Sequence, residues 1–187
     1  MDLTPQAAAT LQEIMDYHEI RKMLSVYCHG CDRGDGARMR SVYGEGSWDD
    51  HGGVYRGPGL DFAEWSNKTL AKTGMRVSHI LGQSQINVTG NQAGAETYFQ
   101  ATMCSKAENG EDILTLMGGR YVDNLIRDKG KWKINKRICV RDWSITLDVK
   151  MDSLRYGDFV QGQLSGEDPS YQALGLVHPG FPPKGAA

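Results

Sequence analysis

Four long strand-like segments follow one another between Met75 and Leu147, and they constrain the fold more than any other feature of the chain. They lie around residues 77–88, 93–105, 113–127 and 132–147. Gly90-Asn91 and Asp128-Lys129-Gly130 separate two pairs of these segments and are typical of hairpin turns. We therefore predict an antiparallel meander. The Gly118-Gly119 pair inside the third segment indicates a bulge or bend in a curved sheet.

Helical patterns precede these strands. Thr4-Pro5 is a good N-cap and first-turn combination. Side chains then recur at a spacing that approximates one helical stripe: Leu11, Ile14, Met15, His18, Met23, Leu24, Tyr27 and Cys31. Shorter helices are expected around 37–43 and over 60–72, with a hairpin or sharply turned loop between them. Helices followed by a meander predict an α+β fold, with the helices packed on one face of the sheet.

The charge balance argues against one broad class of function. The chain has 21 Lys and Arg against 23 Asp and Glu, so it has no basic excess to gather a phosphate backbone. Its N-terminus has early acidic residues and no signal-peptide pattern, and no apolar run is long enough to span a bilayer. We therefore expect a cytoplasmic protein that binds neither nucleic acid nor membrane.

Composition stays uniform until the C-terminal end of the 187-residue chain. This uniformity predicts one domain over residues 1–150. Residues 151–187 are interpreted as a C-terminal extension, partly extended and rich in glycine and proline towards its end. We expect this extension to fold across the domain or across a neighbouring subunit, because it carries apolar side chains such as Tyr171.

The four cysteines are Cys28, Cys31, Cys104 and Cys139, too few and too scattered for a disulfide-stapled scaffold. Cys28 and Cys31 form a C-x-x-C pair, but this pair closes a helix, whereas a redox-active pair is favoured at a helix N-terminus. The chain also lacks the second pair of ligands that would complete a zinc site. We therefore expect reduced thiols that fill the core.

His79 is the first candidate for chemistry. Strand alternation places it on the same face as Val77 and Leu81, so it is expected to point into an apolar interior. A histidine in such surroundings needs a polar partner. By its residue pattern alone, His79 is either a core histidine with a satisfied hydrogen bond or a catalytic base.

Several blocks of the sequence resemble the SnoaL-like proteins of the NTF2-like superfamily. Residues 19–35, EIRKMLSVYCHGCDRGD, resemble the first-helix signature E-I-x-x-L-x-x-Y-x-x-x-x-D-x-x-D. Further blocks agree in order and spacing: WDDHG at 48–52, SHIL at 78–81, GRYVD at 119–123, WKI at 132–134 and RDW at 141–143. The resemblance implies a cone-shaped NTF2-like barrel, with N-terminal helices packed on a curved, mainly antiparallel sheet.

Within this superfamily the blocks are similar to members that eliminate water or halide: scytalone dehydratase, hexachlorocyclohexane dehydrochlorinase and bile-acid 7α-dehydratases. The resemblance implies that Asp32 and His79 are catalytic, and that Tyr27, which precedes the aspartate on the same helix, acts with them. An asparagine often found shortly after the histidine is Gln83 here.

The candidates for contacts with the substrate are His51, Trp48 and Gln83. His51 lies next to Trp48 in a bunch of polar residues between strands. A solvated turn is the structural interpretation of His51. No H-x-D or H-E-x-x-H spacing supports a metal site around it, so no metal is expected. Because the sequence has no phosphate-cradling motif, no other cofactor is expected either.

The chemistry suits these residue types. Elimination of water beside a carbonyl requires a base with a pKa near neutrality, which a histidine oriented by a carboxylate provides. His79 would take the proton, and Asp32 would fix its tautomer and stabilise the imidazolium. Tyr27 would donate a hydrogen bond to the enolate or to the departing hydroxyl. We therefore expect a cofactor-independent dehydratase, a lyase, for an apolar cyclic hydroxy-compound such as a polyketide or a hydroxysteroid, including a bile-acid intermediate.

Other interpretations of the same residues remain open. Asp32 can be a turn residue at the end of the first helix, with Asp35 turned inward instead. Tyr27 can simply pack on the apolar stripe of that helix. The alternative functions are an isomerase or cyclase of a polyketide or ketosteroid, and a non-catalytic ligand-binding or oligomerisation module. A homo-oligomer, either a dimer or a trimer, is expected.

Overall fold

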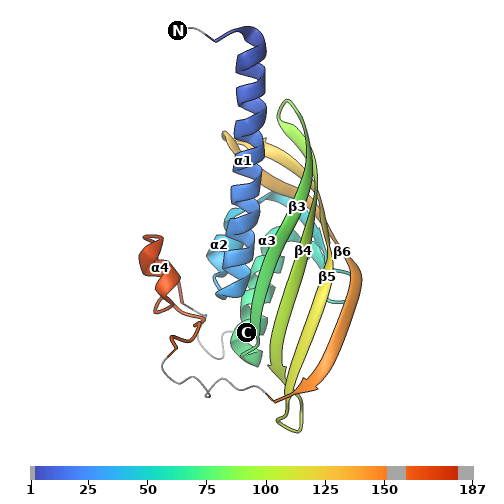
Figure 1. Ribbon diagram of the computed structural model, residues 1–187, viewed down its shortest axis with the longest axis vertical. Helices are drawn as coiled ribbons and strands as arrows, with labels where there is room; N and C mark the ends of the chain where they lie inside the picture. Colours follow the sequence, from blue (N-terminus) through green and yellow to red (C-terminus); the bar gives the residue numbers. More distant parts are fainter. Residues whose placement is uncertain (1–2, 151–158, 181–187) are drawn as a thin grey trace.

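The computed structural model describes residues 3–150 and 159–180, and Figure 1 shows their arrangement. The helices are α1 (Pro5–Asp32), α2 (Gly36–Ser41), α3 (Gly59–Thr73) and α4 (Pro169–Ala173). The strands are β1 (Tyr43–Asp50), β2 (Arg56–Pro58), β3 (Arg76–Thr89), β4 (Gln92–Lys106), β5 (Asp112–Asp128) and β6 (Lys131–Val149). None of the described helices is long and apolar enough to cross a membrane.

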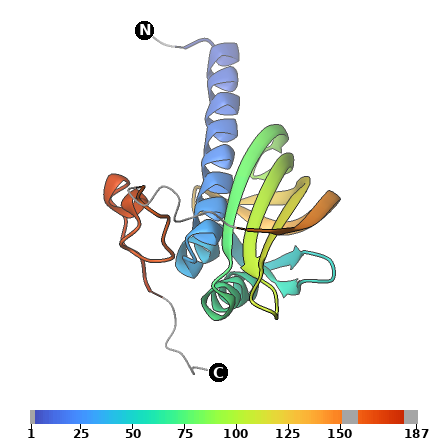
Figure 2. The same cartoon turned by 60° about the horizontal axis from the view of Figure 1, so that its bottom comes forward.

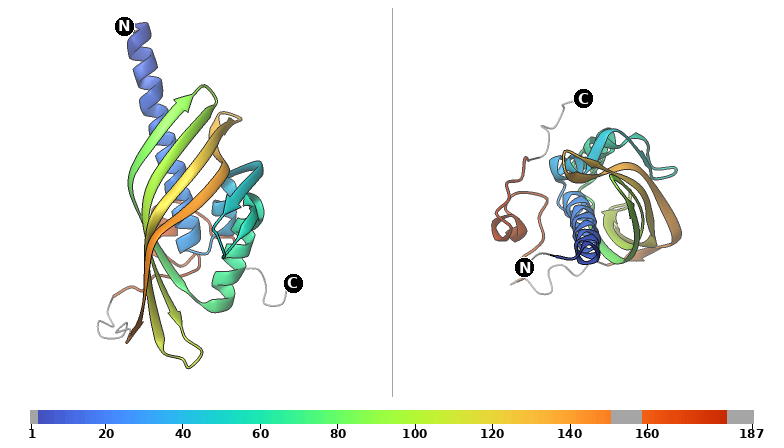
Figure 3. Two further views of the ribbon diagram at one scale, coloured as in Figure 1. Left: turned by 90° about the vertical axis from the view of Figure 1, so that its right-hand side faces the viewer. Right: turned by 90° about the horizontal axis from the view of Figure 1, so that it is seen from above.

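The strands form one six-stranded sheet in the order β2-β1-β6-β5-β4-β3. Strands β3 to β6 pair antiparallel with their sequence neighbours, which confirms the predicted meander. The exception to antiparallel pairing is β1, which runs parallel to β6. The sheet curves around α1 and α3, as Figure 2 and both views of Figure 3 show, but it does not close. The α+β architecture expected from the sequence is therefore confirmed, in the form of an open cone.

Helix α1 buries apolar side chains in its second half only. The Thr4 hydroxyl accepts a hydrogen bond from the Ala7 amide and caps the helix as predicted. The inward face of the second half carries Ile20, Leu24 and Tyr27, none of which is more than 1% exposed. The first turns project beyond the sheet (Figure 1), and the first half of the helix leaves Leu11, Ile14, Met15 and His18 exposed. The expectation of one continuous buried apolar stripe is wrong there, because the residue that these turns bury is the polar Asp16.

The connection from α1 to β1 also differs from the prediction. Helix α2 ends at Ser41, and Tyr43, which was placed in that helix, begins β1 instead. Asp35 is fully buried, and its side chain accepts a hydrogen bond from the Arg38 amide as the N-cap of α2. Asp35 is thus turned inward, as one alternative expected, and its carboxylate binds the Arg38 amide and the Tyr171 hydroxyl.

The glycine pair of β5 makes the predicted irregularity. The register between β5 and β6 shifts between Gly118, which is paired with Trp143, and Gly119, which is paired with Arg141. A Cβ at Gly119 would lie 2.0 Å from the Val140 carbonyl oxygen, and one at Gly118 would lie 2.5 Å from the Trp143 ring. Only glycine allows this close approach, and bulges of this kind bend a strand.

The described part of the C-terminal extension packs against the end of α1. The Tyr171 hydroxyl donates a hydrogen bond of 2.8 Å to Asp35, and the Tyr171 side chain is buried. His178 bonds the carbonyl oxygen of Arg33 at 3.0 Å, and the Arg33 guanidinium lies 3.7 Å from the Asp168 carboxylate. Residues 151–158 and 181–187, which the prediction also assigned to the extension, lie outside the described residues.

A buried ion pair lies in the middle of the core. The Arg137 guanidinium on β6 donates two hydrogen bonds to Asp123 on β5, at 2.8 and 2.7 Å, and neither residue is more than 1% exposed. The guanidinium carbon also lies 4.2 Å from the centre of the Tyr27 ring and 4.1 Å from that of Tyr121. Burial opposes the charge of Arg137, but Asp123 outweighs it and raises the pKa of Arg137.

We expect Asp123→Asn to destabilise the protein by about 3–5 kcal/mol, because it leaves the Arg137 charge buried without its counter-ion. Urea unfolding followed by circular dichroism measures the change. Arg120→Ala is a matched control, because Arg120 lies on β5 like Asp123 but bonds Glu96 and Asp142 in half-exposed pairs, so its loss should change the midpoint little. Equal shifts for the two variants would contradict the importance of the buried pair.

Candidate active site

The candidate site is a cavity of about 750 Å³ bordered by the concave side of the sheet, by α1 and α3, and by the β1–β2 turn. Apolar and aromatic side chains predominate in its lining: Phe62, Trp65, Leu70, Met75, Val77, Phe99, Met103, Met117 and Tyr121. The polar lining residues include Tyr27, Cys31, His51, His79 and Arg141. A largely apolar cavity with a few convergent polar groups is the usual form of a small-molecule site.

Asp32 and His79 form a close pair at this cavity. The Asp32 Oδ1 atom lies 2.6 Å from His79 Nδ1. Asp32 Oδ2 accepts a hydrogen bond of 3.0 Å from the backbone N–H of His79. Their side chains are only 12% and 8% exposed. Because an ionised carboxylate only accepts hydrogen bonds, Nδ1 carries the proton and Nε2 of the neutral ring is free to act as a base. The structure thus places together the two residues that the sequence singled out.

Local structure explains how this pair meets. Asp32 is the last residue of α1, so its side chain leaves the helix where the chain turns towards α2. His79 lies near the start of β3 and lines the cavity together with Val77, as strand alternation predicts. The backbone hydrogen bond from His79 to Asp32 ties the end of the helix to the strand. One carboxylate therefore fixes both the position of the strand and the orientation of the ring.

A second histidine, His51, lines the same cavity and is paired with a carboxylate behind it. His51 Nδ1 makes a very short contact with Asp49 Oδ1, and the Tyr43 hydroxyl donates to Asp49 Oδ2 at 2.5 Å. Asp49 is fully buried. The His51 ring is stacked on Phe62, with ring centres 4.4 Å apart. The sequence predicted His51 as a substrate-binding residue and placed Asp49 in the same polar turn. In the structure Asp49 is buried and binds the His51 ring.

The sequence did contain a signal for Asp49. Residues 47, 49 and 51 alternate along β1 and its continuation, and alternation places them on one face. Ser47 and Asp49 are buried, whereas Trp48 between them is 45% exposed. The three adjacent polar residues 49–51 concealed this pattern, because a polar run also indicates a turn.

Tyr27 lies between the core and the His51 side of the cavity. Its hydroxyl oxygen is 3.4 Å from His51 Nε2, and its ring packs edge-on against Tyr43 and Tyr121. Burial raises the pKa of Tyr27 well above its ordinary value, even though the nearby charge of Arg137 opposes this shift. The phenol is therefore a hydrogen-bond donor near neutral pH.

The structure places Trp48 and Gln83 away from the cavity, although both were expected to contact the substrate. Trp48 points to the outer side of β1, opposite Asp49. Gln83 is exposed and lies where the pairing of β3 with β4 shifts between Leu81 and Ser84. This irregularity interrupts the alternation that begins at His79, so Gln83 does not continue the inward face.

Two further polar groups of the cavity had no assigned role. Arg141 lines it from β6, next to the bulge at Gly119, and its side chain is exposed. Cys31 brings its sulfur within 4.8 Å of ligand atoms of Asp32 and His79. Burial, aided by the charge of Asp32, raises the pKa of the Cys31 thiol to about 12.

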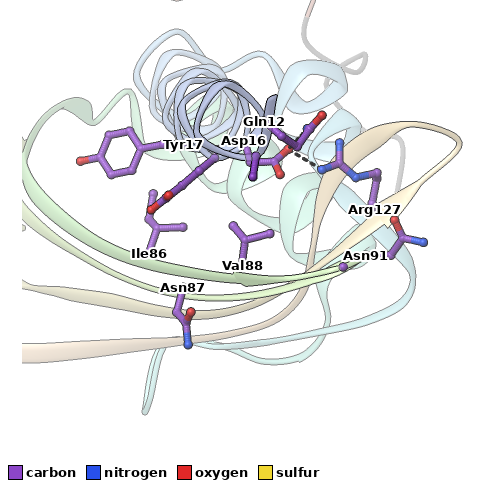
Figure 4. Close-up of a pocket in the computed structure, with 11 residues that line it drawn as sticks. Gln12, Asp16, Tyr17, Ile86, Asn87, Val88, Asn91 and Arg127 are labelled. Carbon is purple, nitrogen blue, oxygen red and sulfur yellow. Dashed lines mark hydrogen bonds and ion pairs between the residues drawn. The ribbon is translucent and has the colours of Figure 1, made fainter. Parts of the chain in front are cut away.

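A separate groove of about 590 Å³ lies between the first half of α1 and β3 (Figure 4). Asp16 is buried beside it and accepts hydrogen bonds from Trp132 at 3.2 Å and from Gln12 at 3.1 Å, besides its ion pair with Arg127. Burial opposes the charge of Asp16, but these donors outweigh it and lower its pKa. The Asp16 carboxylate is therefore bound by other side chains of the protein. Its contacts with Arg127 on β5 and Trp132 on β6 join α1 to the sheet.

The fold is a curved sheet backed by helices, with a largely apolar cavity on its concave side. Residues 12–138 match the model of the SnoaL-like domain, and the chain belongs to this family. The comparison with curated proteins gave no match.

Solved structures share the fold at low identity. A hexachlorocyclohexane dehydrochlorinase is 16% identical, with a TM-score of 0.67 over 77% of this chain and 99% of its own. A protein provisionally assigned as a scytalone dehydratase, from Novosphingobium aromaticivorans, is 17% identical, with a TM-score of 0.64 over 76% and 93%. A Mycobacterium tuberculosis protein of unknown function is 20% identical, with a TM-score of 0.57 over 71% and 75%. Likeness at this level establishes the common architecture.

His51 gives the site a measurable pH dependence of stability. Burial alone would lower the pKa of His51, but the hydrogen bonds to Asp49 and Cys139 outweigh it and raise this pKa to about 9 from an ordinary value of 6.5. The other ionisable groups around the ring include Asp50, Tyr27 and Tyr121. A raised folded-state pKa stabilises the fold fully below about pH 6.5, and this stabilisation is lost as the pH rises through about 9.

We therefore expect the unfolding free energy to fall by about 3 kcal/mol more in the wild type than in His51→Gln between about pH 6 and about pH 9.5. Urea titrations at a series of pH values measure both curves. Parallel curves for the two proteins would show that the His51 ring is not held as a cation.

Proposed function

We propose that the protein is a cofactor-independent lyase that eliminates water from an apolar cyclic hydroxy-compound. The observation that carries the proposal is the Asp32–His79 hydrogen bond of 2.6 Å beside a largely apolar cavity of about 750 Å³. A base of this kind abstracts a proton next to a carbonyl, and an apolar cavity selects a hydrophobic skeleton. The fold neighbours that act as dehydrochlorinase or carry a dehydratase assignment support the same class of reaction.

In the proposed reaction His79 Nε2 removes the proton from the carbon beside the substrate carbonyl. Asp32 keeps the Nδ1–H tautomer before this step and stabilises the imidazolium after it, which offsets the cost of a charge in a buried site. The electron pair released from the C–H bond forms the new double bond, and the hydroxyl group on the next carbon departs. Tyr27 donates a hydrogen bond to the oxygen on which negative charge develops.

The dimensions and lining of the cavity suggest the substrate class. A volume of about 750 Å³ accommodates a fused-ring skeleton of steroid or polyketide size. Met75, Met103 and Met117 are among its lining residues, and methionine adapts to irregular apolar shapes. Arg141 adds a positive charge to this lining, suited to a polar or anionic substituent. A hydroxysteroid, such as a bile-acid intermediate, has both features.

Incubation with a panel of cyclic β-hydroxyketones, comprising hydroxytetralones, hydroxydecalones and hydroxylated ketosteroids, tests this proposal. Mass spectrometry should detect loss of water from at least one of them. His79→Gln and Asp32→Asn should each lower this turnover by about 100- to 10,000-fold, because they remove the base or its orienting carboxylate. Migration of a double bond without loss of water would indicate an isomerase instead.

His18→Asn is a matched control for these variants, because His18 is exposed on the first half of α1, away from the cavity. It should retain wild-type turnover. Melting temperatures of all three variants show whether a lost rate reflects lost folding. Near-normal rates for both His79→Gln and Asp32→Asn would contradict the assigned base pair.

Tyr27→Phe should lower turnover by about 10- to 1000-fold while the melting temperature changes little, because the variant keeps the ring and deletes only the hydroxyl donor. Tyr27→Ala should lower stability as well, since the ring packs against Tyr43, Tyr121 and Arg137. Rate and melting temperature, measured for both variants, separate catalysis from packing. A fully active Phe variant would restrict Tyr27 to a structural role.

A further inference from the structure

The proposed base accounts for one proton of an elimination, but the departing hydroxyl needs another. Hydroxide is a poor leaving group, so a site that expels it gains from a donor that protonates the oxygen as the C–O bond breaks. The cavity contains a second histidine, His51, that the base mechanism does not use. The surroundings of His51 differ from those of His79 and suit a residue that donates a proton.

The protein holds the His51 ring rigidly. Nδ1 is bound to the fully buried Asp49, and one face of the ring stacks on Phe62 at 4.4 Å. The loop that carries it is closed by two hydrogen bonds between His51 and Tyr55 or Val54. This arrangement directs the other nitrogen, Nε2, towards the Tyr27 hydroxyl at 3.4 Å. Both His51 and Tyr27 border the cavity, so their polar atoms share one corner of it.

The two histidines approach the cavity from different elements. His79 comes from β3 and contacts Phe99, with ring centres 6.4 Å apart. His51 follows β1 and contacts Tyr121 at 6.4 Å. Phe99 and Tyr121 stack on each other at 4.4 Å and so link the surroundings of the two histidines. A ring system lying against this aromatic pair would have one histidine near each end.

The surroundings of His51 also favour its charged form. Asp49 on β1 accepts a hydrogen bond from Nδ1–H of His51, and Cys139 on β6 is a second hydrogen-bonding neighbour. Asp49 is in turn bound by the Tyr43 hydroxyl. The guanidinium of Arg137 is covered by the rings of Tyr27 and Tyr121, and its charge is paired with Asp123. The result is a raised pKa for His51, which keeps it protonated near neutrality.

We propose that His51 is the general acid of the site and that it protonates the departing hydroxyl group from Nε2, directly or through the Tyr27 hydroxyl. This inference rests on the proposed lyase function and assigns a second proton-transfer residue to it. His79 takes the proton of the C–H bond, whose electron pair forms the C=C bond. The C–O bond breaks with its electron pair on oxygen, which receives the His51 proton and leaves as water. His79 then holds the extra proton, and exchange with solvent restores both rings.

The test compares two leaving groups in one skeleton. The β-hydroxyketone from the panel that reacts fastest is paired with its acetate ester, because acetate departs without being protonated. His51→Gln should lower elimination of water by about 100- to 10,000-fold. The same variant should lower elimination of acetate by less than about 10-fold. His79→Gln should lower both reactions strongly, since each requires removal of the same C–H proton.

Asp49→Asn provides a second variant, because it keeps the size of the side chain that binds His51 and removes its charge. It should show the same selective loss of water elimination. An NMR titration of the His51 ring should show its pKa near 9 in the wild type and lower in Asp49→Asn. His18→Asn again serves as the control for both rates.

The outcomes distinguish this proposal from the lyase function itself. Equal losses of both reactions in His51→Gln, with wild-type turnover intact, would overturn the acid role and make His51 a substrate-positioning residue. A His51 ring that titrates below pH 7 in the wild type would also overturn it. A wild type that eliminates neither water nor acetate would contradict the lyase function, and the acid assignment would fall with it.

Discussion

The buried Arg137–Asp123 pair is the interaction on which the site depends. A guanidinium enclosed in a core is costly unless its charge is matched, and here a bidentate carboxylate and two aromatic faces provide the match. Tyr27 and Tyr121, whose rings cover this charge, also line the cavity. The cation therefore fixes the aromatic floor on which a ligand would lie, and it links the stability of β5 and β6 to the shape of the site.

Two carboxylate–histidine pairs meet at this floor, and their surroundings separate their roles. Asp32 binds both the ring and the backbone of His79, so it positions a strand as well as a side chain. Asp49 is fully buried, and one of its carboxylate oxygens binds the Tyr43 hydroxyl while the other binds His51. Pairs of titratable groups in unlike environments allow one site to contain both a base and an acid at the same pH. This contrast is the physical basis of the proposed elimination.

The fold separates the parts that build the cavity from those that extend beyond it. The cavity is formed by the second half of α1, by α3 and by the bent middle of the sheet, whereas the first half of α1 leaves Leu11, Ile14 and Met15 in solvent. The described part of the C-terminal extension is bound to Asp35 and Arg33, immediately after the helix end that carries Asp32. The turn that presents the site carboxylate is thus supported from outside the cavity.

The sequence by itself determined the local features. Alternation gave the four long strands and the inward side of His79, and the glycine pair gave the bend. The resemblance in residues 19–35 pointed to Asp32 as the partner of His79, which the geometry places 2.6 Å away. Tertiary structure alone decided which faces meet. The parallel pairing of β1 with β6 brought Asp49 and His51 to the cavity, a shift in β3 removed Gln83 from it, and the limited length of the sheet exposed the start of α1. Periodicity is a short-range property of the chain, whereas strand pairing and its register arise from contacts between distant segments.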